Sequence, residues 1–462
     1  MSARYWTIAE ASAALAKGDV SPVELVDACL QRIEALDPTL HSYVLPLPEP
    51  ARAAAKAAEA DIRAGRRRGP LHGIPIALKD IYETAGIRTT GHSRIKLDHV
   101  PKTDATATRK LAEAGTILLG KLATHEFAMG GPSFDLPFPP ARNPWNPKHF
   151  TGGSSSGSGA AVAAGLALGT LGSDTGGSIR SPASHCGLAG LKPSYGRVSR
   201  AGVFPLSFSL DNCGPMAWTS RDCALLLQAI AGPDPRDPAS VQAPVPDYAA
   251  ALGGDLKGVR IGVVRGFYES DPALDPEVGA AVAAAIRQLR DLGAQIEDVA
   301  LSPADDYHAA CVVIMLAEAF AIHEPMIKTR WREYGAIFRH RLMPGALLSG
   351  PDYVQATRLR RQLALEMDRA LERHTALLFP TSVVPAPPIE EVRAFAFYEK
   401  ASLTTPANVS GHPALSVCCG YTKAGMPMGL QLVGRRFDEA TLLGLGDTYE
   451  RATPWRQRRP TL

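Results

Sequence analysis

The segment from Gly152 to Ser178 holds the residues best suited to chemistry, and it reads GGSSSGSGAAVAAGLALGTLGSDTGGS. Fifteen of its 27 residues are Gly or Ser, but the run from Ala160 to Leu171 is too apolar for a flexible linker. Glycine permits tight turns and the close approach of backbone segments. The pattern predicts two Gly-Gly-Ser turns around a buried helix, with serines from both turns brought to one place.

A serine hydroxyl is a weak nucleophile until a neighbouring base accepts its proton. The segment contains no histidine, and the nearest one, His185, lies beyond Ser178. Lys79 is an alternative base because it follows the apolar run from Gly73 to Leu78, which is typical of a buried strand. Burial lowers the pKa of a lysine, so that its amine can be neutral near pH 7.

The turn from Asp174 to Ser178 contains a second element of a reactive site. Consecutive backbone N–H groups in a Gly-Gly turn can converge on one point and bind an anion. Acyl transfer needs such donors to stabilise its oxyanion. Asp174 and Arg180 flank the turn, and we expect them to form an ion pair that braces it.

Four motifs extend this pattern over nearly the whole chain, from about residue 20 to about residue 450. They are GIPIALKD at 73–80, KLATHEFAMGG at 121–131, NPWNP with the Gly/Ser segment and its continuation at 143–199, and GHPALSV…GMPMGLQLVGRRFDEATLL at 411–443. In these motifs the chain resembles the amidase signature family. The long Gly/Ser motif is highly specific, and the others support it.

The resemblance implies a Ser-Ser-Lys triad, with Ser178 as nucleophile, Ser154 as bridging serine and Lys79 as general base. It also implies that the peptide bond from Gly153 to Ser154 is cis. Neutral Lys79 would draw a proton through Ser154 from Ser178, which attacks the carbonyl; Ser154 would then protonate the leaving nitrogen, and water would hydrolyse the acyl-enzyme.

The resemblance also assigns the remaining parts of the site. The implied oxyanion donors are the backbone N–H groups of Thr175, Gly176, Gly177 and Ser178. Met129 and Gly130, in the loop after Thr124, are implied to line the acyl pocket.

The implied fold is α/β: one large mixed β-sheet covered on both faces by helices, in a single catalytic domain. The sequence itself alternates expected helices and strands, which favours the same class. We expect four regions: an N-terminal helical segment, the signature core, a Pro-rich surface crossing, and the remainder of the sheet with the substrate-pocket helices. Their bounds are 1–65, 66–230, 231–257 and 258–462.

Composition narrows the classes of function. The 462 residues have a formal net charge of +3, which is no footprint of nucleic-acid binding. No apolar run reaches the roughly 18–20 residues of a membrane span, and no signal pattern opens the chain, so we expect no membrane partner and a cytoplasmic location. The seven cysteines show no C-x-x-C pair and the twelve histidines no H-E-x-x-H, so we expect no metal and no cofactor.

Other motifs allow competing interpretations. Gly153 to Gly157 matches the G-x-S-x-G elbow of α/β-hydrolases, with Ser155 as nucleophile, but no strand is expected before it. Ser93 and Lys96 match S-x-x-K without a K-T-G partner, and the glycine-rich segment lacks the G-K-[ST] ending of a phosphate-binding loop. A non-catalytic interaction module remains a further possibility, which the intact triad disfavours.

The main alternative lies within the family: the glutaminase subunit of a tRNA-dependent amidotransferase, which works in a complex. SDTGGSIR and GLKPSYGRVSR are very similar to that subunit. Its glutamine pocket uses an Asp where this chain has Ala401, shortly before 405–408. The segments 334–342 and 352–353 are more similar to stand-alone amidases. We therefore predict a stand-alone amidase, with the glutaminase as alternative.

The substrate is the least defined part of the prediction. Such a site hydrolyses a carboxylic amide and accepts esters, carbamates or ureas. No charged residue stands out as a substrate anchor in the variable segments 132–142, 203–213 and 307–350. An apolar or aryl substrate is indicated by five side chains, Phe134, Phe138, Phe204, Phe208 and Ile314. Relatives are commonly homodimers, so a homodimer is a possible state.

Overall fold

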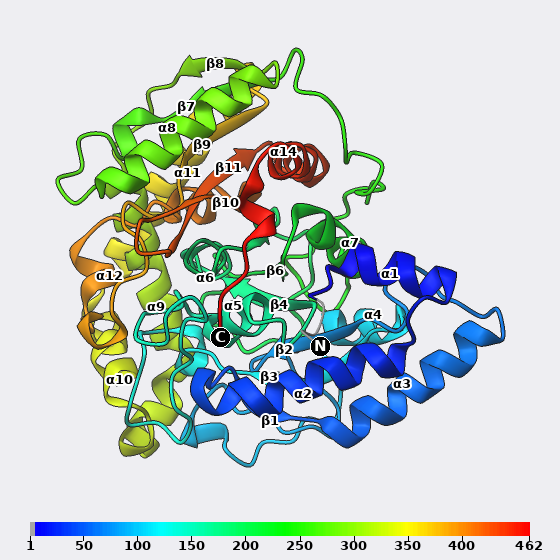
Figure 1. Ribbon diagram of the computed structural model, residues 1–462. Helices are drawn as coiled ribbons and strands as arrows, with labels where there is room; N and C mark the ends of the chain where they lie inside the picture. Colours follow the sequence, from blue (N-terminus) through cyan, green and yellow to red (C-terminus); the bar gives the residue numbers. More distant parts are fainter. Residues whose placement is uncertain (1–4) are drawn as a thin grey trace.

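The computed structural model describes residues 5–462, and an eleven-stranded mixed sheet with helices on either side forms its centre (Figure 1). The strand order is β1-β3-β2-β4-β6-β5-β10-β11-β9-β7-β8. The strands are β1 Tyr43–Pro46, β2 Pro75–Lys79, β3 Ile117–Leu122, β4 Gly169–Asp174, β5 Ala189–Lys192, β6 Asn212–Ala217, β7 Arg260–Val263, β8 Gln295–Asp298, β9 Ala376–Pro380, β10 Ala414–Tyr421 and β11 Pro427–Gly434. The predicted α/β class with a mixed sheet is confirmed.

Parallel pairing occurs in two groups of strands, one near each edge of the sheet. Strand β2 runs parallel to β3 and β4, and β7 runs parallel to β8 and β9. The other neighbouring pairs are antiparallel, including β10 with β5. That pair joins strands from before and after residue 258, so the expectation that the later strands complete the same sheet is confirmed.

The helices carry the sequence signals expected at their ends. Helices α1 and α2 both begin with a capping box, in which Thr7 and Ser21 accept from a backbone N–H and a Glu side chain returns the bond. The helices are α1 Ile8–Lys17, α2 Pro22–Leu40, α3 Pro48–Arg63, α4 Thr106–Glu113, α5 Ser156–Ala163, α6 Arg180–Cys186, α7 Ser220–Ile230, α8 Pro276–Asp291, α9 Ala304–Arg330, α10 Ala336–Leu342, α11 Gly350–Arg373, α12 Ala396–Glu399, α13 Thr405–Ser410 and α14 Glu439–Arg451.

The Gly/Ser segment differs from its predicted course in one respect. The buried helix expected over Ala160–Leu171 ends at Ala163, and the chain then enters strand β4 at Gly169. Strand β4 pairs with β2 on one side and β6 on the other, and all six of its residues are buried. Sheet pairing therefore outweighs the low β-propensity of its glycines.

Among residues 5–462, one helical stretch, Ala304–Glu333, has the length and apolar composition of a membrane span. Half of that apolar window is buried within the protein. Helix α9, which makes up most of the stretch, packs against α11 and α13 and supplies Ile314 and Leu316 to the core. We therefore interpret it as a packed helix of this fold.

Candidate active site

Lys79 is the last residue of β2, at the carboxyl end of the strand. Leu78 lies opposite Leu171 of the parallel strand β4, which brings Lys79 close to Ser173. The Lys79 side chain is fully buried, and its Nζ lies 2.8 Å from Ser154 Oγ and 2.8 Å from Ser173 Oγ. Two hydroxyl groups therefore surround the amine.

Burial lowers the pKa of Lys79 from its usual 10.5 to about 7. The negative charges of Asp211, Cys213 and Asp174 oppose the shift, in that order, but desolvation is the largest cause. Within residues 5–462, Lys79 forms no ion pair with a carboxylate, and its hydrogen bonds go to hydroxyls. A substantial fraction of the amine is therefore neutral at pH 7, as a general base requires.

Ser154 precedes helix α5, in the loop formed by the first Gly-Gly-Ser turn. The peptide bond from Gly153 to Ser154 is cis, as expected. A Cβ at Gly153 would lie 2.0 Å from Cε1 of His125, so only glycine fits there. The carbonyl of Ser154 accepts hydrogen bonds from the N–H groups of His125 and Ser156, at 3.0 and 2.8 Å, which fixes the backbone at this serine.

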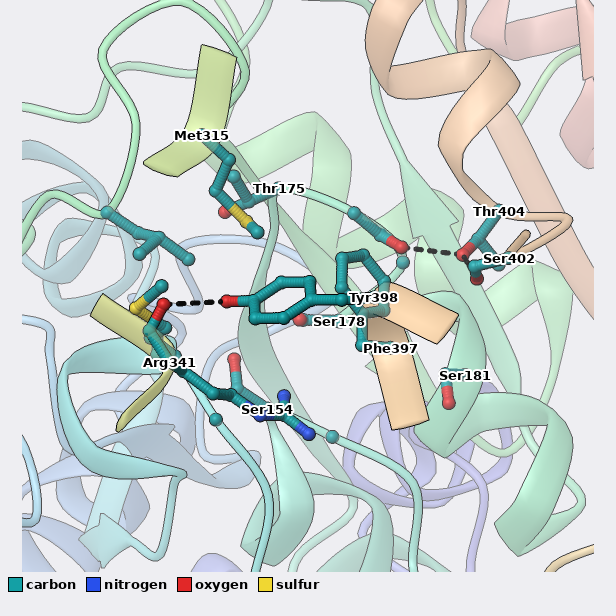
Figure 2. A pocket seen from close by; sticks show the side chains of 17 residues that line it. Ser154, Thr175, Ser178, Ser181, Met315, Arg341, Phe397, Tyr398, Ser402 and Thr404 are labelled. Atoms are coloured by element: carbon teal, nitrogen blue, oxygen red, sulfur yellow. Dashed lines mark hydrogen bonds between the residues drawn. The ribbon is translucent and has the colours of Figure 1, made fainter. Parts of the chain in front are cut away.

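Ser178 lies in the second turn, between β4 and α6. Gly177 before it has φ +124°, and a Cβ there would lie 2.1 Å from Oγ1 of Thr404. Ser178 is partly exposed, and it lines the same cavity as Ser154 (Figure 2). The two turns thus bring the predicted nucleophile and the predicted bridging serine to one cavity.

The backbone amides of the second turn differ in their hydrogen bonding. The N–H of Gly177 donates to Oδ1 of Asp174 at 2.9 Å, so this predicted oxyanion donor is already engaged. Within residues 5–462, the N–H groups of Thr175, Gly176 and Ser178 have no protein acceptor. These three amides border the cavity and are available to bind an oxyanion.

An ion pair holds the second turn in place, as expected. Arg180 and Asp174 are both fully buried, and Nη2 of Arg180 lies 2.9 Å from Oδ1 of Asp174. Arg180 also donates to the side chains of Gln431 and Asn408, at 2.9 and 2.7 Å. Burial raises the pKa of Asp174, but the Arg180 charge and hydrogen bonds outweigh this effect and lower the pKa to about 2. The carboxylate is therefore ionised and fully paired.

The two serines border a cavity of about 110 Å³ (Figure 2). Met129 and Gly130 line it, in agreement with the position predicted for them. Its other lining residues are Ala128, Gly153, Ser154, Thr175, Gly176, Gly177, Ser178, Ser181, Leu206, Met315, Arg341, Phe397, Tyr398, Ser402 and Thr404. The cavity is small, and most of its polar groups are hydroxyls and backbone amides.

The side chains on which an aryl pocket was predicted lie elsewhere. Ile314 is fully buried in the core, and Phe134 is 55% exposed. Phe204 and Phe208 line a separate cavity of about 190 Å³, and Phe138 packs against His92. None of the five lines the catalytic cavity, so the aryl-pocket prediction was wrong about these residues.

Two residues of the site were missed by sequence reasoning. Ser173 is the second hydroxyl on Lys79, and strand alternation from Asp174 would have indicated it only if β4 had been recognised. Arg341, from helix α10, lines the cavity although no charged residue in its segment stood out as an anchor. Its signal in the sequence was weak because Arg339 and His340 beside it are typical of a solvated helix end.

The competing motifs do not form sites of their own. Ser155 is buried, its Oγ donates to the carbonyl of Ser173 at 3.3 Å, and no strand directly precedes it, so there is no hydrolase elbow. The hydroxyl of Ser93 donates to Glu126 at 2.5 Å. Within residues 5–462, no group of three or more His, Cys, Asp or Glu side chains is arranged to hold a metal ion.

Comparisons with known proteins agree with this geometry. The amidase family model matches residues 24–443. The GatA-type subunit of the glutamyl-tRNA(Gln) amidotransferase from Chloroflexus aurantiacus is 44% identical, over 99% of both chains. A solved structure described as a vestigial protein complex that reveals the evolutionary origins of an s-triazine catabolic enzyme superposes with a TM-score of 0.90 at 31% identity, over 96% of this chain and 98% of that one. The native peptide amidase of Stenotrophomonas maltophilia superposes with a TM-score of 0.86 at 33% identity, over 98% of both chains. This protein belongs to the amidase signature family of hydrolases that act on carbon–nitrogen bonds.

Proposed function

We propose that the protein hydrolyses a carboxylic amide through an acyl-enzyme on Ser178. The observation that carries the proposal is the buried amine of Lys79, held 2.8 Å from the hydroxyl of Ser154 with a pKa near 7. Lys79 acts as the base, Ser154 relays the proton, and Ser178 attacks the carbonyl. Esters and carbamates also present a carbonyl and a leaving group, so the same residues accept them.

The developing oxyanion binds to the free amides of Thr175, Gly176 and Ser178. Preorganised backbone donors of this kind stabilise the tetrahedral intermediate, because they need no rearrangement when the charge appears. Lys79 returns its proton through Ser154 to the leaving nitrogen, and the C–N bond breaks. A water molecule then attacks the acyl-enzyme, loses its proton by the same route and releases the acid.

Substitution of the nucleophile tests the proposal. Ser178→Ala should lower kcat by about three orders of magnitude or more, the scale found on removal of a catalytic nucleophile. A fluorophosphonate probe should label the native protein at Ser178. Ser158→Ala is the matched control, because Ser158 belongs to the same Gly/Ser segment but its hydroxyl accepts from Thr170 at 3.3 Å, outside the cavity. Undiminished hydrolysis by the Ser178→Ala protein would overturn the proposal.

A second candidate function is supported by the 44% identity to the amidotransferase protein. As a glutaminase subunit, the chain would hydrolyse glutamine efficiently only with its partner subunits. Ala401 argues against this function, since no side-chain carboxylate stands there to bind the ammonium of a free amino acid. The discriminating assay compares glutamine and simple amides, with the chain alone and co-purified with amidotransferase partner subunits. Glutaminase activity that appears only in the complex would favour the second function.

We also propose that the enzyme works in the cytoplasm. All seven cysteines are buried free thiols, which suits a reducing compartment. Fractionation of cells that express the chain checks this proposal.

A further inference from the structure

One side chain gives the catalytic cavity its charge. Of the seventeen residues that line it, Arg341 is the only one that is ionised at neutral pH, and none is Asp or Glu. Arg341 comes from helix α10, in a different part of the chain from both catalytic turns. Its guanidinium reaches past Ser154 into the cavity, beneath the ring of Tyr398 (Figure 2).

The Arg341 guanidinium is buried and only partly satisfied by the protein. The residue is 6% exposed, and its Nε donates to the carbonyl of Ala394. Its charged group lies 5.7 Å from the ring centroid of Tyr398. Within the described part of the chain it forms no ion pair with a carboxylate, and burial lowers its pKa. The terminal nitrogens therefore border the cavity with no protein anion opposite them.

A buried cation without a partner is costly, because transfer out of water is not offset by an opposite charge. Arginine binds carboxylates through two parallel N–H···O bonds, which makes it well suited to hold one in a fixed orientation. In this cavity a ligand carboxylate would pair Arg341 while the rest of the ligand extends toward the two serines. A cationic ligand group would find no carboxylate in the cavity.

We propose that the substrate is a short amide that carries a carboxylate and no ammonium group. This inference rests on the proposed function, because it places the scissile carbonyl at Ser178 and the carboxylate at Arg341. The small volume of the cavity favours monoamides of short dicarboxylic acids. In the wider cavity of about 360 Å³ that adjoins Arg341, the only acidic lining residue is Glu391, and Ala401 offers no charge.

A matched set of substrates tests the proposal on the native enzyme. Succinamate has one carboxylate, succinamide replaces it by a neutral amide, and asparagine adds an ammonium group to succinamate. We expect kcat/KM for succinamate to exceed that for each of the other two by at least about tenfold, since hydrogen bonds to charged groups have effects of this size. Glutaramate and glutamine repeat the comparison with one more methylene. Equal rates for succinamate and succinamide, or faster hydrolysis of the amino acids, would overturn the proposal.

A charge-neutral variant assigns the effect to Arg341. Arg341→Gln should lower kcat/KM for succinamate about 10- to 100-fold, mainly through KM, and change that for succinamide by less than about threefold. An equal loss for both substrates would refute the assignment. If the variant does not fold, the comparison on the native enzyme decides alone. Loss of all hydrolysis in Ser178→Ala, together with no carboxylate preference in the native enzyme, would refute this inference and leave the proposed function intact.

Discussion

Lys79→Met should make the protein inactive and more stable. The substitution replaces a buried amine by an apolar side chain of similar length, so it removes the desolvation that lowers the lysine pKa. A catalytic group kept in an unfavourable environment reduces stability, and its removal gives that stability back.

The size of the effect follows from the pKa. A change from 10.5 in the unfolded chain to about 7 in the folded protein corresponds to about 5 kcal/mol, at about 1.4 kcal/mol per unit. The variant loses the two hydrogen bonds to Ser154 and Ser173, each about 1 kcal/mol. We therefore expect Lys79→Met to raise the free energy of unfolding by about 2–3 kcal/mol near pH 7.

The pH dependence of this difference has a defined sign. Between pH 7 and 10.5 the unfolded wild-type chain binds one more proton at Lys79 than the folded protein, so wild-type stability rises with pH. Methionine does not titrate. The advantage of the variant should thus shrink by about 1.4 kcal/mol per pH unit from pH 7 to 9.

Equilibrium urea unfolding of both proteins at pH 7, 8 and 9 measures this gap. Lys56→Met is the control, because Lys56 is exposed on helix α3 and its substitution should give no such pH-dependent gap. A variant that is less stable than the wild type at pH 7, or a gap that does not change with pH, would show that the folded protein keeps Lys79 protonated.

Three further outcomes follow from the same site. In the wild type, kcat/KM should rise about tenfold per pH unit below pH 7 and level off above it, because neutral Lys79 is the active base; an acid limb below pH 5 would refute this assignment. Ser173→Val should lower kcat about tenfold and shift the acid limb to lower pH, because the charged amine loses an acceptor, whereas Ser173→Thr keeps the hydroxyl and should retain the wild-type profile. Asp174→Asn should lower the free energy of unfolding by about 3–5 kcal/mol in urea titrations, because it leaves the buried Arg180 without its ion-pair partner; a loss below about 1 kcal/mol would contradict that role.

The sequence predicted the strands that have strong local signals. The β-branched and leucine-rich runs at 376–380 and 414–421 were recognised as strands, because a buried strand needs such side chains on both faces. Strand β4, Gly169–Asp174, has glycines at two of its six positions and one β-branched residue, so its local pattern is not that of a strand. Its conformation is set by pairing with β2 and β6, which are distant in sequence.

The site shows the same division between local and distant information. The triad residues stand in specific motifs, but the position of Arg341 depends on how helix α10 packs. The N–H of Gly335, at the start of this helix, donates to Glu126 at 2.9 Å, and the N–H of Ala336 donates to Asp135 at 2.8 Å. Both carboxylates belong to the loop region around Met129. The charge of the cavity thus follows from long-range contacts, which no local pattern in α10 indicates.

The composition of the Gly/Ser segment explains how a lysine can be the base. Glycines let the chain approach itself closely enough for the hydroxyls of Ser154 and Ser173 to lie 2.8 Å from one amine. The nearby carboxylates are engaged elsewhere: Asp174 pairs with Arg180 at 2.9 Å, and Asp211 accepts from the hydroxyl of Thr175 at 2.6 Å. Hydroxyls satisfy the N–H groups of Lys79 without adding a negative charge that would hold a proton on it. A carboxylate at the position of Ser173 would pair with the amine and keep it charged at neutral pH, so the absence of acidic side chains in direct contact with Lys79 matters as much as the presence of the serines.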